Sequence, residues 1–128
     1  GIAQHAMEEA IRYAKERTAF GKNIGRFQAV QFMIADMALE IQAARNLVYQ
    51  AAFKRDCNVR FSTEAAMAKL YASEVAMKTT KNAIQIFGGY GYSREYPVER
   101  LHRDAKILEI GEGTSEILRM VIGGNALR

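Results

Sequence analysis

Hydrophobic side chains recur along most of the chain at alternating spacings of three and four residues, which is the repeat of one face of an α-helix. The longest such series predicts a helix over residues 27–55. A hydrophobic seam several turns long is typical of a helix that packs against another helix. Its members are Phe27, Val30, Ile34, Met37, Ile41, Ala44, Val48 and Ala51.

Two further series predict helices on either side of this one. A helix is expected over residues 62–87, with Ser62 as its N-cap, because a serine hydroxyl accepts a hydrogen bond from the free N–H groups of the first turn. Its seam contains small residues that allow a neighbouring helix to approach closely: Ala66, Leu70, Ser73, Met77, Thr80, Ile84 and Phe87. A first helix is expected over residues 2–17, with its apolar stripe at Ile2, Ala6, Ala10 and Tyr13.

Glycine and proline mark the connections between helices. Gly21 and Gly25 interrupt the chain after the first helix, and the Gly88–Tyr92 segment ends the third. Pro97 is well placed to start a short helix through about residue 104, and residues 107–112 are expected to be irregular or extended. No period-two alternation of the kind that predicts a β-strand is present.

A last helix is expected after Gly113, with Thr114 as its N-cap and Glu116 in the first turn, where the helix dipole favours a negative charge. The predicted buried face of this helix is Ile117, Met120 and Val121. Two long antiparallel helices flanked by two more predict an all-α fold, an up-and-down four-helix bundle, with residues 1–128 as a single domain. The pattern is already under way at residues 1–3, which suggests a piece of a larger protein.

Composition narrows the classes of function. The hydrophobic content of 49% is enough for a core, and the net charge of +4 arises from basic residues interspersed with acidic ones, which favours a solvated surface over nucleic-acid binding. No apolar stretch of about 18 residues predicts a membrane span. His5 and His102 lack metal-ligand spacing, so no metal site is expected. The single Cys57 rules out an internal disulfide and fits a reducing compartment.

By themselves the residues leave the chemistry undetermined. Glu112 lies near a helix start, where the dipole stabilises a carboxylate, and Arg17 lies in the last turn of a helix, where a cation is favoured. Both therefore have a purely structural explanation. The most informative segments are the glycine-rich loop after Phe87 and the Glu112-Gly113-Thr114 turn.

Six segments resemble motifs of the acyl-CoA dehydrogenases, and their order and gaps agree with that family over essentially the whole chain. One such motif alone is weak evidence, whereas six in register are specific. The resemblance is to the family's C-terminal helical domain. The segments are Arg17–Lys22 (RxxFGK), Phe27–Gln31 (FQxxQ), Gln85–Tyr92 (QxxGGxGY), Glu95–Arg100 (EYPVER), Arg103–Ile107 (RDAKI) and Glu112–Ile117 (EGTSEI).

The resemblance implies an FAD-dependent enzyme that oxidises the Cα–Cβ bond of an acyl-CoA thioester to a trans-2-enoyl-CoA. Glu112 would abstract the α-proton and FAD would accept the β-hydride. The family also has an N-terminal helical domain and a central β domain, forms homodimers or homotetramers, and passes electrons to electron-transfer flavoprotein. It implies the bacterial cytoplasm or the mitochondrial matrix as the location.

The resemblance also assigns the site. Arg17 would reach the FAD pyrophosphate of a neighbouring subunit, and Gly113 would contact substrate. Gly111 stands where relatives often carry Tyr, which should reshape the acyl pocket. Two alternatives remain: a non-catalytic oligomerisation module, or an acyl-CoA oxidase-type flavoprotein domain. The further cofactor-binding positions are Phe20, Gln28, Gln85, Gly88, Gly89, Thr114 and Glu116.

Overall fold

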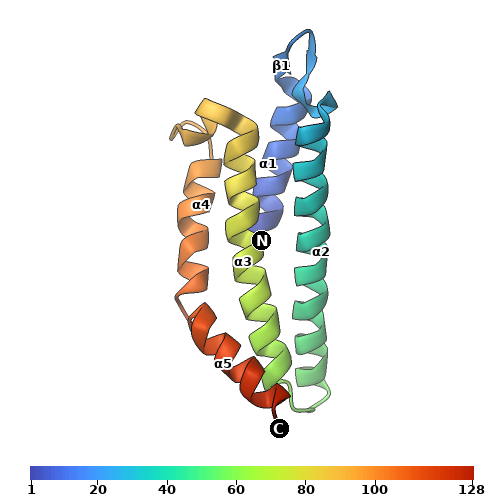
Figure 1. The fold of residues 1–128 in the computed structure, drawn as a ribbon, viewed down its shortest axis with the longest axis vertical. Helices are drawn as coiled ribbons and strands as arrows, with labels where there is room; N and C mark the ends of the chain where they lie inside the picture. The colour runs from blue at the N-terminus through green and yellow to red at the C-terminus, as the bar shows by residue number, and fades with distance from the viewer.

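The computed structural model describes all 128 residues and contains five α-helices (Figure 1). Two long antiparallel helices form its axis, and the other three pack along them. The strict three- and four-residue repeat produces these lengths, because it keeps one face of each long helix against its neighbour over many turns. The helices are α1 (Ile2–Glu16), α2 (Gln28–Asp56), α3 (Ser62–Phe87), α4 (Val98–Lys106) and α5 (Ser115–Ala126).

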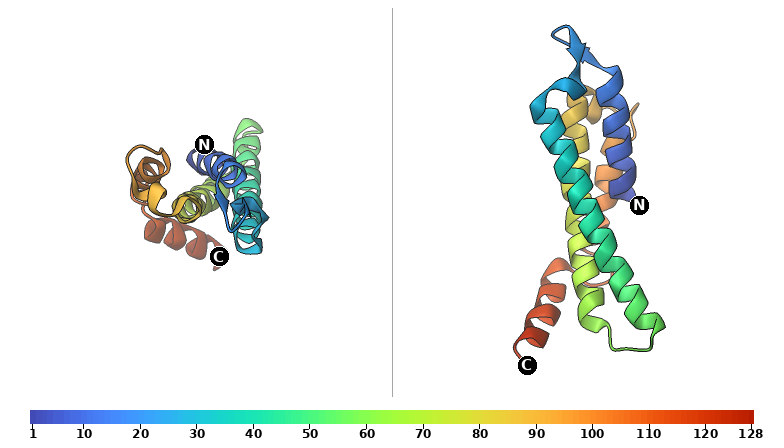
Figure 2. Two further views of the ribbon diagram at one scale, coloured as in Figure 1. Left: turned by 90° about the horizontal axis from the view of Figure 1, so that it is seen from above. Right: turned by 90° about the vertical axis from the view of Figure 1, so that its right-hand side faces the viewer.

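The chain runs up along α1, down along α2, up along α3 and down along α4, which confirms the predicted all-α, up-and-down bundle (Figure 1). Two helices, α4 and α5, together take the place of the fourth helix of the bundle. Helix α4 occupies it beside the upper half of α3, and α5 continues below at an angle to the bundle axis (Figure 2). Helix α3 therefore contacts all four other helices.

Short elements fill the connections. Three 3-10 helices, η1 (Ile24–Arg26), η2 (Gly88–Tyr92) and η3 (Ile107–Glu109), follow α1, α3 and α4. The connector after α1 also contains an antiparallel pair of two-residue strands, β1 (Thr18–Ala19) and β2 (Lys22–Asn23). The prediction of no strand was wrong here, because strands of two residues are too short to show a period-two pattern.

Small side chains let α1 pack closely in the core. Ala6, Ala10 and Ala14 are buried on one face of α1, and the same cluster contains Met37 from α2 and Phe87 from α3. The Phe87 ring stacks on Tyr13 with 4.1 Å between ring centroids. Burial of such side chains is the main stabilising contribution in a bundle of this kind.

Two further local predictions were wrong. Ser62 begins α3, but its side chain makes no capping hydrogen bond. The face Ile117, Met120 and Val121 of α5 is exposed rather than buried, with 50%, 71% and 37% of these residues accessible. Helix α5 instead buries Ser115. An amphipathic stripe shows which face needs a partner, but not whether that partner lies in the same chain.

None of the helices combines the length and the hydropathy needed to cross a membrane.

Candidate functional site

The ends of α1 and α3 enclose a cavity of about 510 Å³ near the top of the bundle. This cavity brings together three of the predicted cofactor residues: Arg17, Gly88 and Gly89. Its wall is largely aromatic and aliphatic, and is completed by Tyr13, Ile24, Ile86, Phe87 and Tyr90.

Arg17 ends α1, and its guanidinium lies 5.6 Å from the centroid of the Tyr90 ring. Its backbone is held on both sides, since its N–H donates to the Tyr13 carbonyl and its own carbonyl accepts from the Ile24 N–H, each at 2.8 Å. The side chain makes no ion pair and donates no hydrogen bond in the structure. An exposed guanidinium with all its donors free suits a phosphate group.

Gly88 and Gly89 present bare backbone to this cavity. Gly88 has a φ of +62°, which ends α3 in a conformation that favours glycine, and a Cβ at either position would meet no heavy atom within 4 Å. Gly91 differs, because a Cβ there would lie 2.6 Å from the Ile84 carbonyl oxygen. The glycine motif therefore combines two open positions with one required for packing, a distinction that the sequence does not reveal.

Phe20, Gln28 and Gln85 do not line this cavity. Phe20 lies at the tip of the β1–β2 turn, 95% exposed, with its ring edge-on to Phe27 at 6.2 Å between centroids. Gln28 begins α2, and Gln85 lies in the last turn of α3. Both amides are exposed and make no side-chain hydrogen bond, so nothing within the chain occupies them.

The second group of predicted residues lies beyond α4. Glu112 and Gly113 have φ values of +58° and +104°. Thr114 then caps α5 by accepting a hydrogen bond from the Ile117 N–H at 3.4 Å, which confirms the predicted N-cap. The nine-residue helix α4, about 13 Å long, lies between this turn and the Gly88–Gly89 segment, which are near its opposite ends (Figure 1).

Left-handed backbone is concentrated at predicted site residues. Only Phe20, Asn58 and Glu112 adopt positive φ without being glycine. Asn58 follows the end of α2, where asparagine is commonly found in this conformation. Phe20 and Gly21 are the two loop residues of the β1–β2 hairpin, and positive φ at both is what a type I′ turn requires. Glu112 has no such explanation, and strained backbone of this kind clusters at functional sites.

The carboxylates of Glu112 and Glu116, on either side of Thr114, have different surroundings. The pKa of Glu116 is lowered from its usual value of 4.5, first by a hydrogen bond from its own backbone N–H and then by one from the Thr114 hydroxyl. Glu112 is exposed and makes no ion pair. Its backbone N–H has no acceptor among the turn and loop hydrogen bonds, so it is free to donate to a ligand.

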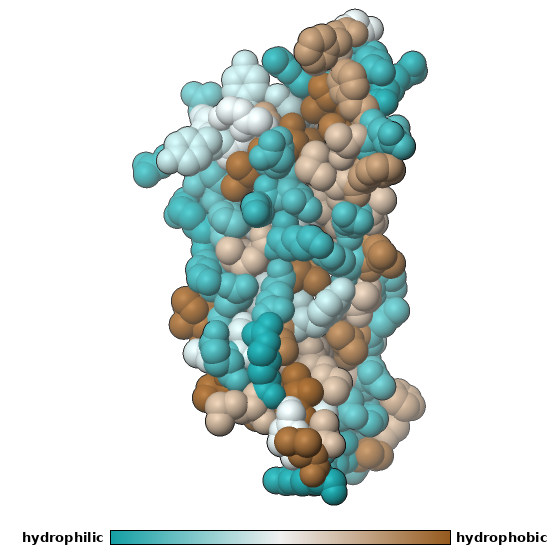
Figure 3. Space-filling model, viewed as in Figure 1, coloured by the Kyte–Doolittle hydropathy of each residue, from teal (hydrophilic) through white to brown (hydrophobic).

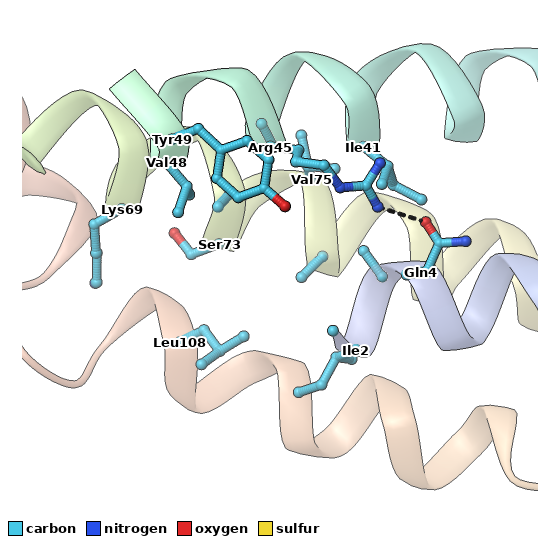
Figure 4. Close-up of a pocket in the computed structure, with 15 residues that line it drawn as sticks. Ile2, Gln4, Ile41, Arg45, Val48, Tyr49, Lys69, Ser73, Val75 and Leu108 are labelled. Carbon is cyan, nitrogen blue, oxygen red and sulfur yellow. Dashed lines mark hydrogen bonds between the residues drawn. The ribbon is translucent and has the colours of Figure 1, made fainter. Parts of the chain in front are cut away.

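A groove of about 400 Å³ is lined by residues of α1, α2, α3 and η3, of which 10 of 15 are hydrophobic, and no residue of the Glu112 turn is among them (Figure 4). Leu108 of η3 and Lys69 of α3 form the side of the groove next to the turn, and Lys69 Nζ donates to the Gly113 carbonyl at 2.5 Å. Most polar groups of the groove have partners within the chain: Arg45 donates to the Gln4 amide oxygen at 3.0 Å, and Ser73 donates to the Leu70 carbonyl at 2.9 Å. The groove therefore suits an apolar ligand.

Lys69, Leu108 and Gly91 were not predicted as site or packing residues. Lys69 meets the turn across 44 sequence positions, and no local pattern records such a contact. Its only signal in the sequence is a lysine between Ala66 and Leu70 on the helix seam. No cluster of three or more His, Cys, Asp or Glu side chains that could hold a metal ion is present.

Comparison with known proteins agrees with this geometry. The family model for the acyl-CoA dehydrogenase C-terminal domain matches residues 1–127. The short-chain specific acyl-CoA dehydrogenase of Megasphaera elsdenii is 55% identical over 100% of this chain and 33% of that protein. The caffeyl-CoA reductase-Etf complex subunit CarC of Acetobacterium woodii is 53% identical over 100% of this chain and 34% of that protein.

Solved structures agree as well. Butyryl-CoA dehydrogenase from Megasphaera elsdenii matches with a TM-score of 0.98 and 54% identity, over 99% of this chain and 33% of that chain. The chain thus spans about a third of the length of the relatives it matches. Together, the family model, the similar sequences and the matching solved structures establish that this chain belongs to the acyl-CoA dehydrogenase family and corresponds to its C-terminal domain.

Proposed function

We propose that this chain is the C-terminal domain of an FAD-dependent acyl-CoA dehydrogenase with three domains, which converts an acyl-CoA thioester to a trans-2-enoyl-CoA. The observation that carries the proposal is the position of Glu112. Glu112 is exposed in a left-handed turn whose Gly113 carbonyl accepts a hydrogen bond from Lys69, and Lys69 and Leu108 line an apolar groove large enough for part of an acyl chain.

In this mechanism Glu112 accepts the α-proton of the bound thioester. The α-carbon of a thioester is only weakly acidic, so the base has to be desolvated and the charge on the thioester oxygen has to be stabilised. The exposed carboxylate would lose water when substrate and the additional domains cover it. The unpaired backbone N–H of Glu112 is a suitable donor to the thioester oxygen, and Gly113, the proposed substrate contact, supplies the left-handed backbone beside it.

The residues of both groups fit an FAD dinucleotide, which supplies hydride acceptance at Cβ when bound. At the upper cavity, Arg17 would donate to the pyrophosphate, and the open backbone of Gly88 and Gly89 permits close approach. Phe20, Gln28 and Gln85 would add contacts from the hairpin and the helix ends, and Thr114 and Glu116 from the start of α5. The separation of the groups supports binding of the upper one to a neighbouring subunit's FAD.

Self-association is part of the proposal. Large hydrophobic side chains are exposed along α2 and α5, including Phe32, Leu39, Phe53, Ile117 and Met120. Figure 3 shows hydrophobic side chains from the upper right of one face down to its lower end, beside a mostly hydrophilic middle. Apolar exposure on this scale marks interaction surfaces, which is consistent with a homodimer or homotetramer.

Electron-transfer flavoprotein is the proposed electron acceptor, and one relative is itself named as a subunit of a reductase-Etf complex. The same relative supports a second candidate, reduction of an enoyl-CoA, in which protonated Glu112 would return a proton to Cα. The proposed location is the bacterial cytoplasm or the mitochondrial matrix, which is supported by one bacterial relative and one named as mitochondrial.

The test is Glu112→Gln in the full-length enzyme, with Glu109→Gln as the matched control, because Glu109 lies three positions earlier and is paired with Lys106. The amide keeps the shape of the carboxylate but cannot take the proton. Flavin bleaching by acyl-CoA in anaerobic stopped flow should fall about 10²–10⁴-fold in Glu112→Gln, with acyl-CoA and FAD still bound. Bleaching at the wild-type rate would remove Glu112 from catalysis and favour a non-catalytic role for this turn.

A further inference from the structure

The turn that carries Glu112 receives one side-chain hydrogen bond from another helix, while α5 beyond it is joined to α3 by packing and by the Arg119–Glu74 ion pair. Lys69, near the start of α3, donates from Nζ to the Gly113 carbonyl at 2.5 Å. The other hydrogen bonds of residues 110–114 are local, because they join this segment only to Ile107 and to the first residues of α5. Lys69 is therefore the single hydrogen-bonding link from helices α1–α4 to this segment.

The hydrogen bond from Lys69 restrains the Gly113–Thr114 peptide, one residue beyond Glu112, the proposed base. Glu112 and Gly113 both have positive φ, a conformation that persists only where the surroundings hold it. The Lys69 ammonium binds the carbonyl immediately after Glu112 and so restrains the orientation of the Gly113–Thr114 peptide. A charge-assisted hydrogen bond is about twice as strong as a neutral one, which makes the ammonium well suited to hold a strained turn.

The surroundings of Lys69 give it no other evident task. It is half-buried and pairs with no carboxylate, unlike Lys54 and Lys78, which form ion pairs. Its stem lines the apolar groove on the same side as Leu108 (Figure 4). A partly buried ammonium whose single acceptor is a backbone carbonyl of the turn is explained by positioning that turn.

We propose that Lys69 is a positioning residue for proton abstraction, which holds the Glu112 turn at the edge of the acyl groove. The inference rests on the proposed role of Glu112 as the base. In the step concerned, the Cα–H bond of the thioester breaks and an O–H bond forms on the Glu112 carboxylate. Lys69 touches neither atom and acts through the Gly113 carbonyl.

The experiment measures removal of the α-proton separately from hydride transfer to the flavin. Full-length holoenzyme is mixed in D₂O with an acyl-CoA whose Cβ is replaced by sulfur, so that the α-carbon exchanges its proton but is not oxidised, and mass spectrometry follows deuterium uptake. Lys69→Met keeps the stem and removes the donors, and Lys69→Arg restores a cationic donor. Lys78→Met is the matched control, because it removes a 2.5 Å lysine link from the same helix to Glu40 of α2.

Lys69→Met should slow exchange about 10–100-fold, since a displacement of the base by about 1 Å is enough for such a loss. Thioester affinity should stay within about threefold of wild type, because ground-state binding does not use the base. Lys69→Arg should recover most of the rate, and Lys78→Met should exchange as wild type. In a Lys69→Met/Glu112→Gln double variant, the Lys69 change should add nothing further, because it acts only through Glu112.

Four results would overturn the proposal. Exchange in Lys69→Met within about threefold of wild type, with Glu112→Gln inactive, would reject the role of Lys69 and leave the base in place. Exchange at the wild-type rate in Glu112→Gln would reject the base and the positioning residue together. An additive double variant would show that Lys69 acts elsewhere. Loss of the fold or the flavin in both Lys69→Met and Lys69→Arg would assign Lys69 to stability instead.

Discussion

Alanine at Gly91 should destabilise the bundle, whereas alanine at Gly89 should not. Gly91 is buried against the end of α3, where a Cβ would lie 2.6 Å from the Ile84 carbonyl oxygen and 2.9 Å from the Phe87 Cβ. The corresponding position at Gly89 has no heavy atom within 4 Å. The same substitution at two places in η2 therefore separates the effect of packing from the effect of losing a glycine.

The contact distances set the magnitude. Ordinary Cβ contacts lie at 3.4–4 Å, so η2 would have to move away from α3 by several tenths of an ångström, and the obstacle includes helix backbone rather than a flexible side-chain end. Overpacking of this kind costs about 1–3 kcal/mol. At about 4 °C per kcal/mol for a domain of this length, Tm should fall by about 4–12 °C. Gly89→Ala should be neutral or stabilising by up to about 1 kcal/mol, because alanine restricts the unfolded chain.

Far-UV circular dichroism of the 128-residue chain during heating and in urea measures both effects, with an unchanged urea m-value as evidence that the unfolded state is comparable. Equal midpoints for the two variants would refute the packing argument. The same pair then tests the cofactor proposal in the full-length enzyme. Gly89→Ala should weaken FAD binding although the fold is intact, and unchanged FAD affinity would mean that this backbone does not approach the dinucleotide.

Two further predictions concern charge. Arg17→Ala in the full-length enzyme should loosen FAD and subunit association together, measured by flavin release and sedimentation, because one guanidinium would serve a neighbour's pyrophosphate; unchanged FAD affinity would leave Arg17 with only a helix-terminal role. The chain should also lose stability in acid, because the pKa values of Glu64, Glu99 and Glu116 lie below 4.5, mainly through hydrogen bonds from Lys54, Arg103 and the Glu116 backbone N–H respectively. A carboxyl whose pKa is lower in the folded state than in the unfolded state stabilises the fold at pH values above its unfolded pKa, and this contribution is lost as the pH falls through its folded pKa. The urea midpoint should therefore decrease as the pH is lowered below about 4.5. A midpoint that does not change with pH in that range would contradict the assignment.

The sequence by itself determined the helices and the family. The three- and four-residue spacing from Phe27 to Ala51 is a local property of an amphipathic helix, so it predicted α2 to within a residue or two at each end. The glycine-rich segment was found in a similar way, because Gly88 supplies the positive φ that ends α3. Thr114 is the clearest case, since a cap involves only the next three residues. The Glu112 turn was found through the family motif instead, since a glutamate does not indicate left-handed backbone.

Tertiary structure decided what meets across the chain. Lys69 and Gly113 are 44 positions apart, and only the packing of α5 against the start of α3 brings them into contact. Likewise, Gly89 and Gly91 look equivalent in the motif, and only the position of α3 makes one open and the other closed. Ile117 and Met120 form an apolar stripe like those of the core helices, yet they are exposed, because hydrophobic periodicity records the need for a partner while the three-dimensional arrangement determines whether this chain provides it.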